Sequence, residues 1–166
     1  NGSKGVGFYQ NTQGARLRFT PVLKQYGDMS LKVKADPAKT AGQGFGSTGQ
    51  YMDFGIKFHT EKLTGYALRV IRVKEASDAV AMALVEYRDG ESRYLTALQM
   101  VSCYLTGFCV TVRLEGTTLI ATAECDTPQP VCQMEKGYAH ELRLETEVSG
   151  NQEGGILVWH TGTPGT

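Results

Sequence analysis

Apolar and polar side chains alternate along several segments of the chain, which is the pattern of a β-strand with one buried face. The alternation is clearest in "DMSLKVKA" (28–35), "YMDFGIKFH" (51–59) and "AHELRLETEV" (139–148). In the second segment one face carries the core candidates Met52, Phe54, Ile56 and Phe58. The opposite face carries Tyr51, Asp53, Gly55, Lys57 and His59.

Other segments extend this β pattern. "YALRVIRV" (66–73) and "GGILVWH" (154–160) are apolar on both faces, as in strands of a sheet that is covered on each side. "GFCVTVRLEGTTLIATAEC" (107–125) predicts a hairpin that turns near 115–118. "EASDAVAMALVEY" (75–87) fits a helical stripe as well as a strand, and its flanking strands favour the strand. About ten strands and almost no helix predict an all-β protein, an antiparallel two-sheet jelly-roll β-sandwich.

Size and charge narrow the picture further. The 166 residues predict a single domain over 1–166, and 17 basic against 17 acidic residues give a net charge of zero. This balance offers no electrostatic case for nucleic acid or an anionic membrane. No apolar run reaches the roughly 20 residues of a membrane span. The chain starts at Asn1 without a signal-peptide pattern, so a mature form and an excised piece of a longer polypeptide both remain open.

The stretch "GFGSTGQYMDFG" (44–55) contains two nucleotide-enzyme patterns, G-x-G-x-x-G and D-F-G. A dinucleotide fingerprint needs a helix directly after its glycines, and here the clearest strand of the chain follows instead. A kinase needs V-A-I-K and H-R-D motifs, which are missing. We therefore interpret the glycines as a loop and Phe54 as a core residue.

Four cysteines, Cys103, Cys109, Cys125 and Cys132, lie close together without the spacing of a zinc site. Disulfides in an exported protein are favoured over buried free thiols. Local closure as 103–109 with 125–132 is preferred because each pair brackets a turn-like segment. A cross-strand 109–125 bond is the competing pairing.

Three segments carry a resemblance to a known family: "TGYALRVIRV" (64–73), "VTVRLEGTTLIATAEC" (110–125) and "EGGILVWHTG" (153–162). Together they resemble the strand series of concanavalin A-like jelly rolls, particularly laminin-G-type domains. The resemblance covers roughly 27–162 and consists of packing and turn signatures. It implies a module that accompanies secreted bacterial enzymes acting on polysaccharides, while other members of the fold are glycosidases or lyases.

No catalytic string of those enzymes is present. The E-x-D-x-x-E string of laminarinase-like jelly rolls is absent, and "HELRLE" (140–145) matches only part of an alginate-lyase motif. Glu141, Arg143, Glu145 and Glu147 are interpreted as a solvated strand face. A glycoside hydrolase or polysaccharide lyase stays as the alternative, with Asp53 and Glu86 as acid and base.

A polar set on one strand face is the candidate ligand site. Tyr51, Asp53, Lys57 and His59 flank the gap left by Gly55, and a hairpin register would bring Arg69 opposite Gly55. An aromatic ring beside charged groups suits a sugar, and the competing interpretation is an exposed, ion-paired face without a ligand. Trp159 is assigned to the core. Asp28 is the candidate calcium ligand, and no other cofactor is expected.

These observations predict a non-catalytic, carbohydrate-associated module of a secreted, periplasmic or cell-surface protein. Its expected partners are an oligo- or polysaccharide and an adjoining catalytic domain. A purely structural domain without a ligand is the third possibility.

Overall fold

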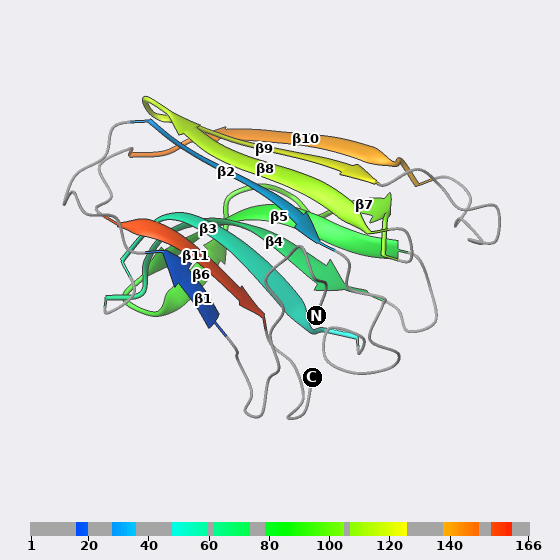
Figure 1. Ribbon diagram of the computed structural model, residues 1–166, viewed down its shortest axis with the longest axis horizontal. Coiled ribbons are helices and arrows are strands. Elements are labelled where there is room, and N and C mark those ends of the chain that lie inside the picture. The colour runs from blue at the N-terminus through cyan, green and yellow to red at the C-terminus, as the bar shows by residue number, and fades with distance from the viewer. Residues whose placement is uncertain are drawn as a thin grey trace.

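Two antiparallel β-sheets stack face to face, and every described element is a strand (Figure 1). The predicted all-β, two-sheet antiparallel sandwich is therefore confirmed. The computed structural model describes residues 16–19, 28–35, 48–59, 62–73, 79–104, 107–125, 138–149 and 154–160, with the backbone alone for 16–19 and 156–160. Within these ranges, no helix is long and apolar enough to cross a membrane.

The large sheet has seven strands in the order β1-β11-β3-β4-β5-β6, with β7 also pairing with β5. Their bounds are β1 (Arg16–Phe19), β3 (Tyr51–His59), β4 (Thr64–Arg72), β5 (Ala79–Arg88), β6 (Glu91–Tyr94), β7 (Gln99–Ser102) and β11 (Gly155–His160). The small sheet has the order β10-β9-β8-β2. It consists of β2 (Met29–Ala35), β8 (Phe108–Glu115), β9 (Thr118–Cys125) and β10 (Glu141–Glu147).

The main core lies between the sheets, where each strand sends every second side chain inward. Phe54 and Ile56 of β3 are fully buried there, as predicted. The ring of Phe54 meets Phe108 of the small sheet edge-on, with 6.4 Å between ring centroids. The alternation of β8, β9 and β10 places one face of the small sheet in this core. The other face is mostly polar, half-buried along most of β8 and β9 and exposed along β10.

Two ambiguous segments are now assigned. Residues 79–88 form the long buried strand β5, which confirms the strand interpretation. Gly49, with φ +88°, lies in a turn, and β3 begins two residues later. Because a strand follows this glycine directly, no helix N-terminus faces a phosphate here, and the loop interpretation holds for its described part. Gly44 and Gly46 lie outside the described residues.

A β-bulge in β3 corrects one prediction. Ile56 pairs with Tyr66 and His59 with Thr64, so β3 holds one extra residue between these pairs. Lys57, with φ +52°, is the extra residue of this bulge. The insertion reverses the inward–outward alternation, and Phe58 lies in a second cluster with Ala67, Val85 and Tyr87. The prediction that Phe58 shares a face with Phe54 and Ile56 is wrong.

One disulfide joins the two sheets, but not with a predicted pairing. It links Cys103, directly after β7, to Cys125 at the end of β9. In the β8–β9 register Phe108 faces Cys125, so the side chain of Cys109 projects from the opposite face and is a free thiol. The pairings 103–109, 125–132 and 109–125 are therefore wrong. Cys132 lies outside the described residues.

Candidate functional site

An ion pair stands on the outer face of the large sheet, the face that points away from the small sheet. Asp53 of β3 lies directly opposite Arg69 of β4. The Arg69 guanidinium donates two hydrogen bonds, from Nε to Oδ1 and from Nη2 to Oδ2 of Asp53, each 2.9 Å long. The sequence placed Arg69 opposite Gly55, and the turn and the bulge at Lys57 shift the register by two residues. Arg69 and Asp53 are thus in direct contact.

Tyr87 of β5 completes the hydrogen bonding of this pair. Its hydroxyl donates to Oδ2 of Asp53 and accepts from Nη2 of Arg69. The Nη1 group of Arg69 donates to Oγ of Ser92 on β6, at 3.2 Å. Four neighbouring strands therefore contribute to one connected network.

Aromatic rings surround the guanidinium. The Cζ atom of Arg69 lies 4.0 Å from the ring centroid of Tyr51, 5.6 Å from that of Tyr87 and 5.8 Å from that of Tyr94. Contacts within about 6 Å are attractive because the ring faces are electron-rich. We call this group the outer-face cluster: Tyr51, Asp53, Arg69, Tyr87, Ser92 and Tyr94.

The centre of the cluster is buried, so the competing interpretation of an exposed, ion-paired face does not describe it. Asp53 is 2% exposed and Arg69 5% exposed. Burial raises the pKa of Asp53 above its usual value and outweighs the opposing effect of Arg69 and Tyr87. Burial alone would lower the pKa of Arg69, but the hydrogen bonds and charge of Asp53 raise it. Arg69 therefore stays protonated.

The rim of the cluster reaches solvent. Tyr94 is 49% exposed although its ring stands near Arg69. Ser92 is exposed and Tyr51 half-buried. The arrangement offers a ligand an accessible aromatic surface and a hydroxyl, and both stand beside the buried, hydrogen-bonded pair of Arg69 and Asp53.

Tyr87, Ser92 and Tyr94 were missed at the sequence level. The signal was present in the turn "YRDGES" (87–92), because a hairpin there places Tyr87 opposite Ser92. The helix–strand ambiguity of 75–87 hid this register.

Two of the five predicted ligand residues lie elsewhere. The Lys57 amide donates to Sδ of Met29, at 3.4 Å. Burial lowers the pKa of the Lys57 amine, and the nearby charge of Asp28 partly opposes this. His59 accepts a 3.2 Å hydrogen bond at Nδ1 from the Lys62 amide in the hairpin turn. The bulge separates these side chains from Asp53, so the single face expected for Lys57, His59 and Asp53 is wrong.

Asp28 anchors a turn of the small sheet. Its Oδ1 accepts a 2.8 Å hydrogen bond from the amide of Gly116, which lies between β8 and β9. The described part of the chain holds no group of three or more His, Cys, Asp or Glu side chains arranged for a metal. Calcium binding at Asp28 stays a prediction.

Glu86 cannot act together with Asp53. Glu86 lies opposite Tyr66, a residue of the main core, whereas Asp53 lies opposite Arg69 on the outer face. The sheet therefore separates the two carboxyl groups. Glu86 is instead held by the guanidinium groups of Arg88, at 3.0 Å, and Arg93, at 2.6 Å. The pairing of Asp53 and Glu86 as acid and base is wrong.

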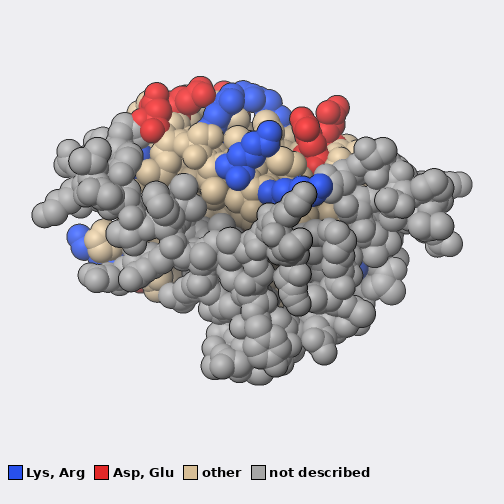
Figure 2. Space-filling model, in the orientation of Figure 1, with Lys and Arg blue, Asp and Glu red and all other residues tan. Residues whose placement is uncertain are grey.

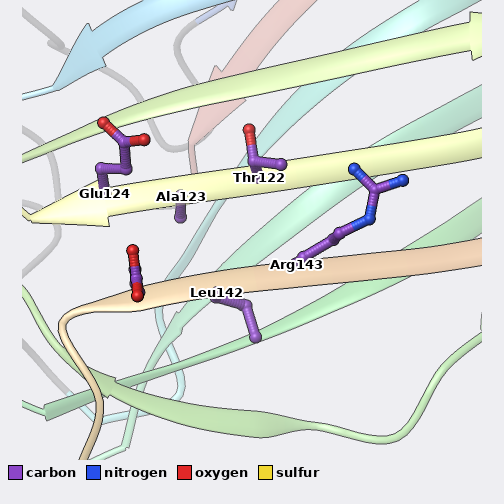
Figure 3. A pocket seen from close by; sticks show the side chains of 6 residues that line it. Thr122, Ala123, Glu124, Leu142 and Arg143 are labelled. Atoms are coloured by element: carbon purple, nitrogen blue, oxygen red, sulfur yellow. The ribbon is translucent and has the colours of Figure 1, made fainter.

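The exposed face of the small sheet is the other polar surface. Charged side chains gather at the top of Figure 2, over the strands of this sheet in Figure 1. An open pocket of about 310 Å³ lies between β9 and β10 (Figure 3). Its lining residues are Thr122, Ala123, Glu124, Glu141, Leu142 and Arg143.

The chemistry of this pocket is weaker than that of the outer-face cluster. Glu124 and Glu141 lie directly opposite each other on β9 and β10. Arg143 donates a 2.7 Å hydrogen bond to Glu145, two residues further along β10. The exposure of 141, 143, 145 and 147 confirms the predicted solvated strand face. The pocket has no aromatic lining residue, so the outer-face cluster is the candidate ligand site.

Comparison with known proteins gives few matches. No protein family matches the sequence, and neither does any curated protein. A similar solved structure is the CBM2 module of the evolved Dit of Lactobacillus casei BL23 phage J-1, with a TM-score of 0.46 and 10% identity. The superposition covers 82% of this chain and 62% of the CBM2 chain. The present chain therefore spans less than two thirds of the length of the CBM2 chain.

Proposed function

We propose that this chain is a non-catalytic, carbohydrate-binding β-sandwich module of an exported protein. In this proposal an oligo- or polysaccharide binds at the rim of the outer-face cluster. One observation carries it: the half-exposed ring of Tyr94 and the hydroxyl of Ser92 stand on a buried network around Arg69. Aromatic rings with a polar neighbour suit the C–H faces and hydroxyls of sugars.

Preorganisation supports binding at this rim. The Arg69 side chain is hydrogen-bonded from Nε, Nη1 and Nη2, so it has little freedom left to lose when a ligand arrives. Ser92 is held by this guanidinium, and Tyr94 stands beside it. A rigid aromatic contact costs less conformational entropy on binding than a mobile one.

Export is part of the same proposal. The Cys103–Cys125 disulfide is typical of a secreted, periplasmic or cell-surface protein. The laminin-G-like segments favour a companion of polysaccharide-degrading enzymes, with a catalytic domain in the same polypeptide. The sequence of the full-length polypeptide would test this part directly.

A glycan array followed by calorimetry tests the binding function. We expect Tyr94→Ala to weaken binding of any glycan hit at least tenfold, because the stacking surface is lost. Thr122→Ala, on the exposed face of the small sheet, is the matched control and should leave the affinity unchanged. A hit whose affinity is unaffected by Tyr94→Ala would contradict the proposed site. Reducing-sugar release from the same glycans would contradict the non-catalytic assignment.

A further inference from the structure

We infer that the outer-face cluster takes an uncharged glycan rather than an acidic one. This inference rests on the proposed function and concerns the charge of its ligand. It follows from the way in which the single cation of the cluster is used.

The positive charge of Arg69 is already balanced within the cluster. Both carboxylate oxygens of Asp53 accept from the guanidinium, at 2.9 Å each. The Nη1 group is directed to Ser92 and Nη2 also to Tyr87. At 5% exposure, the guanidinium has little surface left for a carboxylate or sulfate of a ligand.

The other outer-face positions on the strands around the cluster, β3 to β6, add no charge. Level with the ion pair, β5 places Ala83 on this face, and nearer the turns β3, β4 and β5 place Gly55, Ala67 and Val85 there. β6 contributes Ser92 and Tyr94, because Tyr87 and Val85 lie opposite them. Over the described outer face of β3 to β6, the formal charge is therefore zero, from one Asp and one Arg. An anionic sugar would lose hydration here without gaining a cation.

The rim nevertheless suits a neutral sugar. Ser92 accepts its hydrogen bond from Arg69 through Oγ, so its own hydroxyl hydrogen remains available to a sugar oxygen. The half-exposed ring of Tyr94 offers a surface for the C–H face of a pyranose. Both contacts are indifferent to ionic strength.

Calorimetry with four probes tests the inference: cellohexaose and laminarihexaose as neutral glycans, and hexagalacturonate and a heparin hexasaccharide as acidic ones. Each is titrated at about 20 and about 500 mM NaCl into the wild-type chain, Tyr94→Ala and Thr122→Ala. We expect a neutral hexasaccharide to bind at least tenfold tighter than either acidic one. Its affinity should change less than twofold with salt and be lost in Tyr94→Ala alone.

The outcomes separate the inference from the function on which it rests. Tighter binding of an acidic probe that weakens with salt and is lost in Tyr94→Ala would overturn the inference and leave the glycan-binding function standing. If the affinity for a bound probe is the same in Tyr94→Ala as in the wild type, the proposed site is wrong and the inference falls with it. If an array of neutral and acidic glycans gives no hit, both fall.

Discussion

Arg69 and Asp53 face each other across neighbouring strands, and the guanidinium and carboxylate meet in two parallel hydrogen bonds inside a buried site. This geometry is specific to arginine, because a lysine ammonium cannot match both carboxylate oxygens in one plane. The pair links β3 to β4, and through Tyr87 it reaches β5.

Removing one partner of this pair should destabilise the fold strongly. We expect Asp53→Ala to cost about 3–5 kcal/mol in free energy of unfolding, because Arg69 would be left buried without a counter-charge. The double variant Asp53→Leu with Arg69→Met should be less destabilised than Asp53→Ala. Urea unfolding measures both. Glu145→Ala, which breaks the exposed pair with Arg143, is the control and should cost no more than about 1 kcal/mol. An equally small effect of Asp53→Ala would show that the pair is not buried.

Tyr87 should make the fold sensitive to alkali. Burial and the charge of Asp53 raise the pKa of Tyr87 above its ordinary value of about 10. The phenol is protonated in both states below this pH, but above it the unfolded chain ionises first. The free energy of unfolding should therefore fall as the pH rises beyond about 10. Denaturant titrations between pH 8 and 11 should show a weaker decline in Tyr87→Phe than in the wild type. Equal declines of the free energy of unfolding in both proteins would contradict the assignment of this pH dependence to Tyr87.

Gly154 is required by a close backbone contact. A methyl group at this position, where φ is +142°, would overlap the backbone of Phe58 and His59. We expect Gly154→Ala to destabilise the protein by more than about 2 kcal/mol. Gly116, at φ +59°, has open space around it, so Gly116→Ala should cost only the backbone strain of about 1–2 kcal/mol. Thermal unfolding of the two variants gives the comparison, and equal losses would exclude the steric explanation.

The disulfide should stabilise the sandwich by closing a loop between its sheets. Cys103 and Cys125 are 22 residues apart, for which chain entropy gives about 3 kcal/mol. We expect Cys103→Ser with Cys125→Ser to lose about this amount in chemical unfolding, and Cys109→Ser to lose almost nothing. Peptide mapping without reduction should recover a 103–125 cross-linked peptide. A cross-link to Cys109 would contradict the pairing.

The sequence pattern predicted much of the architecture, because alternation records which side chains are buried. Phe54 and Ile56 were placed in the core by parity alone, and the hairpin of 107–125 turns near 115–118 as predicted. The laminin-G-type assignment within the β-sandwich folds stays a prediction, as does the single-domain boundary.

The errors along β3 share one physical cause, which is that the alternation of side chains reverses at a single inserted residue. The bulge at Lys57 is defined by its backbone dihedral angles, and the residue types around it in the sequence do not indicate an inserted residue. It moved Phe58, Lys57 and His59 away from their expected faces. The competing 109–125 disulfide failed because a one-residue difference in register puts Phe108 rather than Cys109 opposite Cys125. The preferred local pairing failed because the bond joins the two sheets, which turn-like segments between cysteines do not reveal.

Within the site, Asp53, Arg69 and Tyr51 were predicted to lie together, and they do. Their burial was not predicted, because it depends on how side chains pack over the sheet. The binding role of these residues stays a proposal.

The orientation of Cys109 has a practical consequence. Its thiol lies on the polar face of the small sheet, whereas the outer-face cluster lies on the face of the large sheet that points away from the small sheet. With Cys132 replaced by serine, a maleimide linker at Cys109 could fix the protein to a sensor chip with Tyr94 turned toward the flowing sample. The fold thus supplies an oriented attachment point that leaves the proposed binding rim unobstructed.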